Sequence, residues 1–459
     1  MERLLFVVSD LHLGGAPGGN DHPGFQMCTA AGRARLAAFI EFVTSQRGTH
    51  RDIHLVLAGD IVDFLAEEDF AAFTDDQQAR QKLERILQRT DEVWSSLEGL
   101  VRSGARLTLL LGNHDIELSL PGPRRLLLDR LGGGRIEFIY DNQAYVEGPV
   151  LIEHGNRYDA WNVVSHDGLR EVRSALSRGE PPPAFESPAG SHLVCEVMNR
   201  LKSQYPFVDL LKPEDAGLLP LLAVLAPSCM SDIVKIVPMW RKQAQVEFDE
   251  AGLPLDAANI AAAQSHDEAM IALAQDLAYG DTASVGAFEE LKGIIELWRV
   301  RNSKEDDTRQ LQRLYRALRA RAESTWYAFD VNRESDVYLN PARASAARGF
   351  KVVVFGHTHL VKRVALQDGS LYLNTGTWAD LMQVPKAVLT GDEAEGHRQL
   401  AEFLDALKAN RLSPWRRQVP TFGRIEFAGD TLTSADVFFF DAPGQVERVP
   451  DGCLTRLSS

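Results

Sequence analysis

The sequence has 459 residues, 45% hydrophobic and 25% charged, which is the composition of an ordinary globular protein. Its formal net charge of −15 disfavours broad binding to nucleic acids, because an acidic surface repels polyanions. The four cysteines form no C-x-x-C pair, so they indicate neither a zinc knuckle nor a disulfide framework and favour a cytoplasmic location.

The N-terminal third of the chain alternates β-rich runs with helical patterns. Strands are expected at residues 4–8, 53–58, 107–111, 136–139 and 150–152. Amphipathic helices are expected at residues 30–46 and 67–102. Because strands and helices alternate, the sequence predicts a layered α/β core.

The pattern changes after residue 156. Residues 157–345 show no strand pattern and carry apolar residues at helical spacing, at Val285, Phe288, Leu291, Ile295 and Trp298 and at Leu311, Leu314, Tyr315 and Leu318. β-rich runs return at residues 351–355, 361–365, 371–373, 424–427 and 436–440. We therefore expect one discontinuous α/β domain, residues 1–156 and 346–459, interrupted by an all-helical insertion at 157–345. The insertion would cap or gate a site, or serve as an arm for oligomerisation.

Two apolar segments could be mistaken for targeting or membrane signals. The run at residues 4–8 is too short for a signal peptide and is interpreted as the first strand. The stretch 216–240 contains three prolines as well as Asp232 and Lys235. It is therefore interpreted as a buried or interfacial helix, and no transmembrane segment is expected.

Short polar segments follow five of the expected strands, and α/β sheets place their sites in the loops at the carboxyl ends of strands. Their polar members are Asp10 and His12, Asp60 and Asp63, Asn113, His114 and Asp115, His154, and His357 and His359. A carboxylate beside an imidazole suits a first-row divalent metal, and an asparagine carbonyl is a neutral oxygen ligand. Any one segment could be a helix cap or a turn. Taken together, the five segments predict a metal site.

The series D-x-H, G-D-x-x-D, G-N-H-D, H-G and G-H-x-H resembles the calcineurin-like metallophosphoesterase superfamily. All five blocks are intact and in the order of that family, within residues 1–156 and 346–459. The resemblance implies a four-layer α/β/β/α sandwich with a binuclear metal centre in the loops at one edge. It also implies hydrolysis of a phosphate ester by a hydroxide that bridges the two metals.

The resemblance also assigns roles to residues of this sequence. One metal would be held by Asp10, His12, Asp60 and His359, and the other by Asp60, Asn113, His154 and His357, with Asp60 as the bridge. His114 would stabilise the transition state or protonate the leaving group, and Asp115 would orient its imidazole. Asp63 would either hydrogen-bond to a ligand or cap a helix. The segment 374–378 is interpreted either as part of the family pattern or as a turn closing the sheet.

The donor set contains no thiolate and fits two divalent cations, for which we expect manganese, with iron, zinc or cobalt as alternatives. The expected substrate is a phosphodiester or pyrophosphate of a small molecule or nucleotide, contacted by Arg157 and His166. The run 154–159 is comparable to one in relatives that hydrolyse the pyrophosphate of UDP-diacylglucosamine. Those relatives are usually shorter and usually carry arginine at the position of His114.

Two other functions remain open. The first is a nuclease that binds DNA through the insertion, where Arg309, Arg313 and Arg316 share one predicted helix face. The second is a non-catalytic metal-binding scaffold that acts through the insertion. The net charge of −15 ranks the nuclease behind the small-molecule enzyme, and the intact ligand set ranks the scaffold last.

Overall fold

The computed structural model describes residues 2–17, 24–202, 204–212, 221–222, 224–225, 307–320 and 328–454. The chain divides into two compact units. Unit 1 comprises Met1–Cys195, Asp330–Asp380 and Gln418–Gly452, and unit 2 comprises Glu196–Phe329, Leu381–Arg417 and Cys453–Ser459. The helical pattern from Val285 to Trp298 and most of the stretch 216–240 lie outside the described residues.

Unit 1 contains a seven-stranded sheet with the order β14-β13-β12-β1-β3-β5-β6. Strands β1 (Glu2–Val8), β3 (Arg51–Ala58), β5 (Arg106–Leu110) and β6 (Ile136–Ile139) are parallel neighbours. The antiparallel part is formed by β12 (Thr421–Ala428), β13 (Thr431–Ala442) and β14 (Gln445–Arg448). The expected strands at 136–139 and 150–152 have their predicted bounds, and the others differ from prediction at one or both ends.

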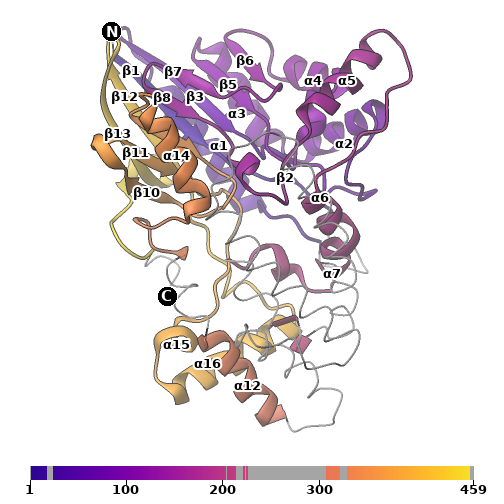
Figure 1. The fold of residues 1–459 in the computed structure, drawn as a ribbon, viewed down its shortest axis with the longest axis vertical. Helices are drawn as coiled ribbons and strands as arrows, with labels where there is room; N and C mark the ends of the chain where they lie inside the picture. The colour runs from indigo at the N-terminus through magenta and orange to yellow at the C-terminus, as the bar shows by residue number, and fades with distance from the viewer. Residues whose placement is uncertain are drawn as a thin grey trace. The chain divides into compact units, whose positions relative to one another are not determined.

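A second sheet of unit 1 has five strands in the order β10-β11-β9-β8-β7. They are β7 (Tyr145–Glu147), β8 (Val150–Ile152), β9 (Val352–Phe355), β10 (Lys362–Ala365) and β11 (Leu371–Asn374). Strand β8 pairs in parallel with β9, with Val150 opposite Val352, so two segments separated by about 200 residues lie side by side (Figure 1). A two-strand ribbon joins β2 (Leu13–Gly14) to β4 (Val62–Asp63).

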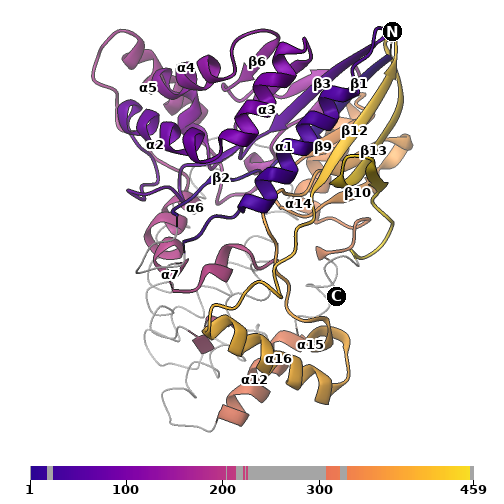
Figure 2. The same cartoon turned by 180° about the vertical axis from the view of Figure 1, so that it is seen from behind.

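Helices cover one face of each sheet. On the larger sheet, α1 (Ala30–Ser45) and α3 (Asp91–Arg102) lie on one face, running along the strands (Figure 2), and share its core. On the smaller sheet, α14 (Asp336–Ala347) packs against β9. The other helices of unit 1 are α2 (Asp76–Arg89), α4 (Pro121–Arg130), α5 (His166–Ser177), α6 (Ala189–Leu193), η1 (Ile116–Ser119), η2 (Asn156–Tyr158) and η6 (Gln367–Gly369). Mixed α/β architecture is therefore confirmed.

The helical segment expected at about residues 67–102 is helical from Asp76 and consists of two helices, α2 and α3. They are divided at Thr90, whose φ of −122° lies outside the helical range. Asp75 begins α2, since its side chain accepts hydrogen bonds from Gln77 N and Gln78 N at 2.9 Å. Residues 67–75 thus remain outside the helix and can contribute to loops near the strand ends.

Unit 2 is helical over the part that the structure describes. It contains α7 (Asn199–Lys202), η4 (Pro206–Asp209), α12 (Asp307–Ala320), α15 (Lys386–Thr390) and α16 (Glu393–Lys408), with the π-helix η3 (Val194–Met198) at the boundary of the units. The helix expected around Leu311–Leu318 is confirmed as α12, whereas α15 and α16 lie in a region that the sequence assigned to the α/β domain. The domain boundaries at 156 and 346 stay a prediction. No helix in the described ranges combines the length and apolarity needed to span a bilayer.

Candidate metal centre

The five motif segments follow β1, β3, β5, β8 and β9, as the sequence predicted. Several of their polar residues have left-handed backbone angles, namely Asp10 (φ 54°), His12 (44°), Asp60 (49°), His357 (71°) and His359 (63°). Each such angle costs a non-glycine residue about 1–3 kcal/mol, so it persists only where the surrounding structure enforces it. Strain concentrated at five of the seven candidate ligands is typical of a functional site.

Glycines let these loops approach one another closely. A Cβ at Gly59 would lie 2.6 Å from the His154 ring, and one at Gly112 would lie 2.0 Å from Asp60 Oδ1. A Cβ at Gly356 would lie 2.6 Å from Asp10 Oδ2. Glycine is therefore needed at these positions, because a side chain there would keep the carboxylates and imidazoles of different loops apart.

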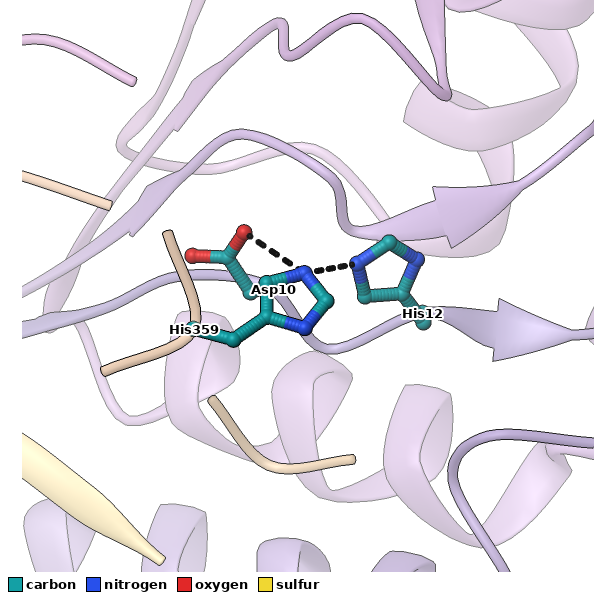
Figure 3. A group of neighbouring side chains, drawn as sticks. All are labelled: Asp10, His12 and His359. Carbon is teal, nitrogen blue, oxygen red and sulfur yellow. Dashed lines mark hydrogen bonds and ion pairs between the residues drawn. The ribbon is translucent and has the colours of Figure 1, made fainter. Parts of the chain in front are cut away.

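The first group of candidate ligands is Asp10, His12 and His359, whose ligand atoms all lie within 4.8 Å of one another (Figure 3). The Nε2 atom of His359 is 3.5 Å from Asp10 Oδ1 and 3.0 Å from His12 Nε2. All three side chains are buried. Two imidazole nitrogens directed at each other in a buried acidic site are a suitable arrangement for a shared cation.

The second group is Asp60, His154 and His357, again with ligand atoms within 4.8 Å. Asp60 Oδ2 is 3.2 Å from His154 Nε2 and 3.8 Å from His12 Nε2 of the first group. Asp60 is thus the carboxylate that touches both groups, in the place predicted for a bridging ligand.

One buried atom supports a metal at the second group. Asn113 Oδ1 is buried and makes no hydrogen bond, whereas Asn113 Nδ2 donates to Asn162 Oδ1 at 3.2 Å. His154 Nδ1 lies 2.9 Å from Ala58 O, so His154 Nε2 is the nitrogen directed at Asp60. Because a buried polar atom without a partner is costly, Asn113 Oδ1 fits direct ligation of a divalent cation.

Burial and neighbouring charges shift the pKa values of the candidate ligands in different directions. Burial raises the pKa of Asp60, but the imidazoles of His154 and His114 outweigh it and hold that pKa well below its usual value. Burial likewise raises the pKa of Asp10, and this time burial prevails. Burial lowers the pKa of His154, but Asp60 outweighs it and raises the pKa to about 10. An ionised buried Asp60 attracts positive charge, which a proton or a metal ion can supply.

His114 and His12 share one carboxylate. Asp63 Oδ1 lies 3.1 Å from His114 Nδ1, and Asp63 Oδ2 lies 3.3 Å from His12 Nδ1. Asp63 Oδ1 also accepts a hydrogen bond from Ala66 N at 3.0 Å, so it stabilises the local turn as well. The His114 side chain is 18% exposed, against 1% for His12 and His154. His114 is therefore placed to meet a ligand from solvent while Asp63 holds its ring.

The expected orienting role of Asp115 is corrected by these contacts. The Asp115 carboxylate accepts hydrogen bonds from Gly112 N and Ile61 N, both at 2.7 Å, so it ties two motif loops together. It is fully buried, and burial together with the nearby Asp60 raises its pKa to about 7. Asp63, in the segment that follows β3, lies beside the His114 ring instead.

The two predicted substrate contacts lie just past the fourth motif. Arg157 Nη1 is 4.0 Å from Glu153 Oε1, and its guanidinium lies 5.7 Å from the Tyr158 ring centroid. Burial, reinforced by Arg173, lowers the pKa of His166 to about 4. Among the described residues, no hydrogen bond or ion pair joins Arg157 or His166 to a candidate ligand, and their substrate role stays a prediction.

Several residues contact the candidate ligands in ways that the sequence did not predict. Thr377 Oγ1 donates to Asp10 O at 2.6 Å, and Ser9 Oγ donates to Asp10 Oδ2 at 2.5 Å. The segment 374–378 therefore does contact the first group. Asp159 and Asn162 contact the candidate ligands His357 and Asn113. Asp159 lies in the 154–159 run, but nothing in its spacing marked it as a partner of the distant His357.

The fold and the centre describe a mixed α/β domain whose clustered histidines and carboxylates could hold metal ions. Residues 4–202 match the family model described as calcineurin-like phosphoesterase, which supports the resemblance over this segment. Four of the five motifs fall inside the match; the G-H-x-H motif lies beyond it and reaches the centre through the pairing of β9 with β8. No curated protein matches the chain. The domain indicates metal-dependent phosphoester hydrolysis.

Proposed function

We propose that this protein is a binuclear metal-dependent phosphoesterase that hydrolyses a phosphodiester or pyrophosphate bond of a small molecule or nucleotide. The observation that carries the proposal is the position of Asp60 between two ligand groups, within 3.2 Å of His154 Nε2 and 3.8 Å of His12 Nε2. A single carboxylate touching both groups is what a pair of cations sharing one ligand requires. The orphaned Asn113 Oδ1 supports the second position.

The residues divide the chemistry between them. When bound, two divalent cations would lower the pKa of a water molecule and offset charge on the phosphoryl oxygens. His114, held at Nδ1 by Asp63, can donate a proton from its imidazolium form to the leaving oxygen, and the Asp63 carboxylate stabilises that imidazolium before the transfer. Asp10 is held by Ser9 and by the backbone N–H of His357, which fixes its carboxylate toward the first group.

We further propose the four-layer arrangement that the resemblance implies, with residues 157–345 as its insertion. Support comes from burial on both faces of both sheets. Phe6 packs with α1 on one face of the larger sheet, while Val7, pointing to the opposite face, is also fully buried. Val353 packs with α14, while its neighbour Val354 is equally buried on the other face. Two sheets stacked through those inner faces would account for this burial.

Manganese is the proposed metal, with iron, zinc and cobalt as alternatives, since the donors are imidazole, carboxylate and amide oxygen. A cytoplasmic location and oligomerisation through the insertion remain predictions. The nuclease and scaffold alternatives depend on residues 157–345, and much of that segment lies outside the described ranges.

The test is metal reconstitution followed by hydrolysis of two model substrates. Metal-free protein is loaded separately with manganese, zinc, iron and cobalt, and bound metal is measured by elemental analysis. We expect about two equivalents per chain and faster cleavage of bis-p-nitrophenyl phosphate than of p-nitrophenyl phosphate. Asp141→Asn is a matched control, because Asp141 pairs with Arg170 and Arg173 rather than with a candidate ligand. One equivalent or fewer with every metal would contradict the binuclear proposal, and preference for the monoester would contradict the substrate class.

A further inference from the structure

A chain of polar contacts runs beside the second ligand group. His357 Nε2 lies 3.0 Å from Asp159 Oδ2, and Asn162 Nδ2 donates to the same Asp159 oxygen at 2.7 Å. Asn162 Oδ1 in turn accepts from Asn113 Nδ2 at 3.2 Å. The loop containing Asp159 and Asn162 therefore contacts two candidate ligands from distant parts of the sequence.

Each of these contacts occupies one polar atom of a candidate ligand and leaves its other polar atom available to a metal ion. A carboxylate only accepts hydrogen bonds, so Asp159 selects the His357 tautomer that carries its proton on Nε2 and has its lone pair on Nδ1. Asn162 accepts from the amide nitrogen of Asn113, which fixes the rotation of that side chain. The remaining atom, Asn113 Oδ1, is buried without a hydrogen-bond partner.

The loop itself is fixed from several directions. Asp159 Oδ1 accepts from Trp161 N at 3.0 Å, and Asn156 Nδ2 donates to Asn162 O at 2.8 Å. Gly190 N donates to Trp161 O at 2.7 Å, and a Cβ at Gly190 would lie 2.4 Å from Asn162 Oδ1. A loop held this way can impose an orientation on the ligands that it touches.

The first ligand group has a different support. His12 is held by Asp63, whose carboxylate also contacts His114. Neither Asp159 nor Asn162 has a hydrogen bond or ion pair with Asp10, His12 or His359 among the described residues. The side-chain contacts of Asp159 and Asn162 thus reach ligands of the second group only.

We propose that residues 156–162 form a positioning loop for one metal position only, with Asp159 orienting His357 and Asn162 orienting Asn113. The inference rests on the proposed binuclear function, because it assigns both ligands to the same cation. It adds two positioning residues and predicts that the two cations can be weakened independently. Removal of a hydrogen-bond partner of a metal ligand commonly lowers metal affinity by about 10–100-fold.

The test is a manganese titration of metal-free protein by equilibrium dialysis, which needs no activity readout. Asp159→Asn and Asn162→Ala should each weaken one equivalent about 10–100-fold and leave the other within about twofold. Asp141→Asn is the control for loss of a carboxylate elsewhere. Equal weakening of both equivalents, or no change in either, would overturn the positioning role. A wild-type protein that binds fewer than two equivalents would instead overturn the binuclear function itself.

A double-mutant comparison separates positioning from a general structural role. If Asn162 acts only through Asn113, Asn162→Ala should cost almost nothing further in the Asn113→Ala background. The same holds for Asp159→Asn in the His357→Ala background. Additive losses would show that these residues act by another route and would overturn the inference. Circular dichroism of each metal-free variant identifies any that do not fold; if Asn162→Ala fails, the isosteric Asp159→Asn decides the result.

Discussion

Unit 1 contains two buried clusters of imidazoles and carboxylates, and they behave differently. One is the candidate metal centre. The other, here called the His54 network, comprises His54, Thr108, Tyr145, Glu147, Arg106 and Arg3 and links the two sheets. His54 Nε2 lies 2.8 Å from Thr108 Oγ1, and its Nδ1 lies 3.2 Å from Glu147 Oε2. Both ring nitrogens therefore have partners.

Both carboxylate oxygens of Glu147 also have hydrogen-bond partners. Its Oε1 accepts from Arg106 at 2.9 Å, and its Oε2 accepts from Tyr145 at 2.5 Å. Hydrogen bonds from His54 and Tyr145 outweigh burial and hold the pKa of Glu147 well below its usual range. Both ring nitrogens of His54 and both carboxylate oxygens of Glu147 therefore have partners, which is how proteins usually accommodate buried charge.

The metal centre differs from the His54 network in its backbone. Its ligands follow strand ends and several adopt left-handed φ angles, whereas His54 lies inside β3 with an ordinary φ. The centre also keeps the candidate ligand atom Asn113 Oδ1 buried without a hydrogen-bond partner, whereas both ring nitrogens of His54 have partners. A buried histidine therefore indicates a ligand site when its backbone is strained and a candidate oxygen ligand near it is unsatisfied, and burial alone is not sufficient.

The largest expected contrast pairs one carboxylate from each cluster. Asp60→Ala should lose bound metal and reduce phosphodiester hydrolysis by at least roughly 10³-fold, because the bridging ligand is removed. Glu147→Ala should retain metal and keep turnover within a few-fold while lowering thermal stability. Elemental analysis, a hydrolysis assay and a thermal melt of each variant check both. Loss of metal in Glu147→Ala would erase the distinction between the clusters.

The next effect separates metal binding from proton transfer inside the centre. His114→Ala should keep its metal content and lower turnover by roughly 10²–10⁴-fold, the usual contribution of general acid–base catalysis. The physical reason is that His114, at 18% exposure, is held by Asp63 and can reach a substrate. Turnover is measured under saturating metal, with Asp141→Asn as the control. An unchanged rate in His114→Ala would remove its catalytic role.

A smaller effect is expected at Asp63. Asp63→Asn replaces an acceptor of two imidazoles with an amide, so one metal equivalent should bind about 10–100-fold more weakly. Because His12 belongs to the first group, the equivalent affected should differ from the one affected by Asp159→Asn. A variant with both substitutions, titrated with manganese, should therefore weaken both equivalents. If the two single variants weaken the same equivalent, the two groups do not bind separate cations.

The candidate ligands of the metal centre could be predicted from the sequence, because they lie in short motifs directly after β-rich runs. Asp10, Asp60 and His357 were found because each follows a β-rich run, and the carboxyl ends of parallel strands meet at one edge. The candidate ligands of one motif are also close in sequence, as Asp10 and His12 are. The division between α2 and α3 at Thr90 was not predicted, because apolar periodicity continues on both sides of it.

The orienting residues were harder to predict because they act across loops. Asp115 is adjacent to His114 in sequence, but its carboxylate is used by the amides of Gly112 and Ile61. Asp63, 51 residues away, contacts the ring instead. Asp159 and His357 are 198 residues apart, and only the assembled sheets bring them together. Pairing across such separations has no signature in a single sequence.

The smallest expected effect tests whether the His54 network is purely structural. Burial lowers the pKa of His54 below its ordinary value of 6.5. The unfolded chain therefore binds more protons than the folded one below about pH 6.5, and the network's contribution to stability falls as the pH drops. Glu147 adds a further loss at lower pH, since its folded pKa is depressed and its stabilising effect disappears as the carboxylate protonates.

His54→Gln should be less stable than wild type by about 1–2 kcal/mol at pH 8, because hydrogen bonds to Thr108 and Glu147 are weakened. That difference should shrink between pH 7 and pH 5, since the variant has no imidazole to protonate. Urea unfolding of metal-free protein at four pH values measures the change, and the exposed His50→Gln is the control. A difference that stays constant with pH would mean that His54 is not held neutral by burial. Metal content should be unaffected throughout, because the network contributes no atom to either ligand group.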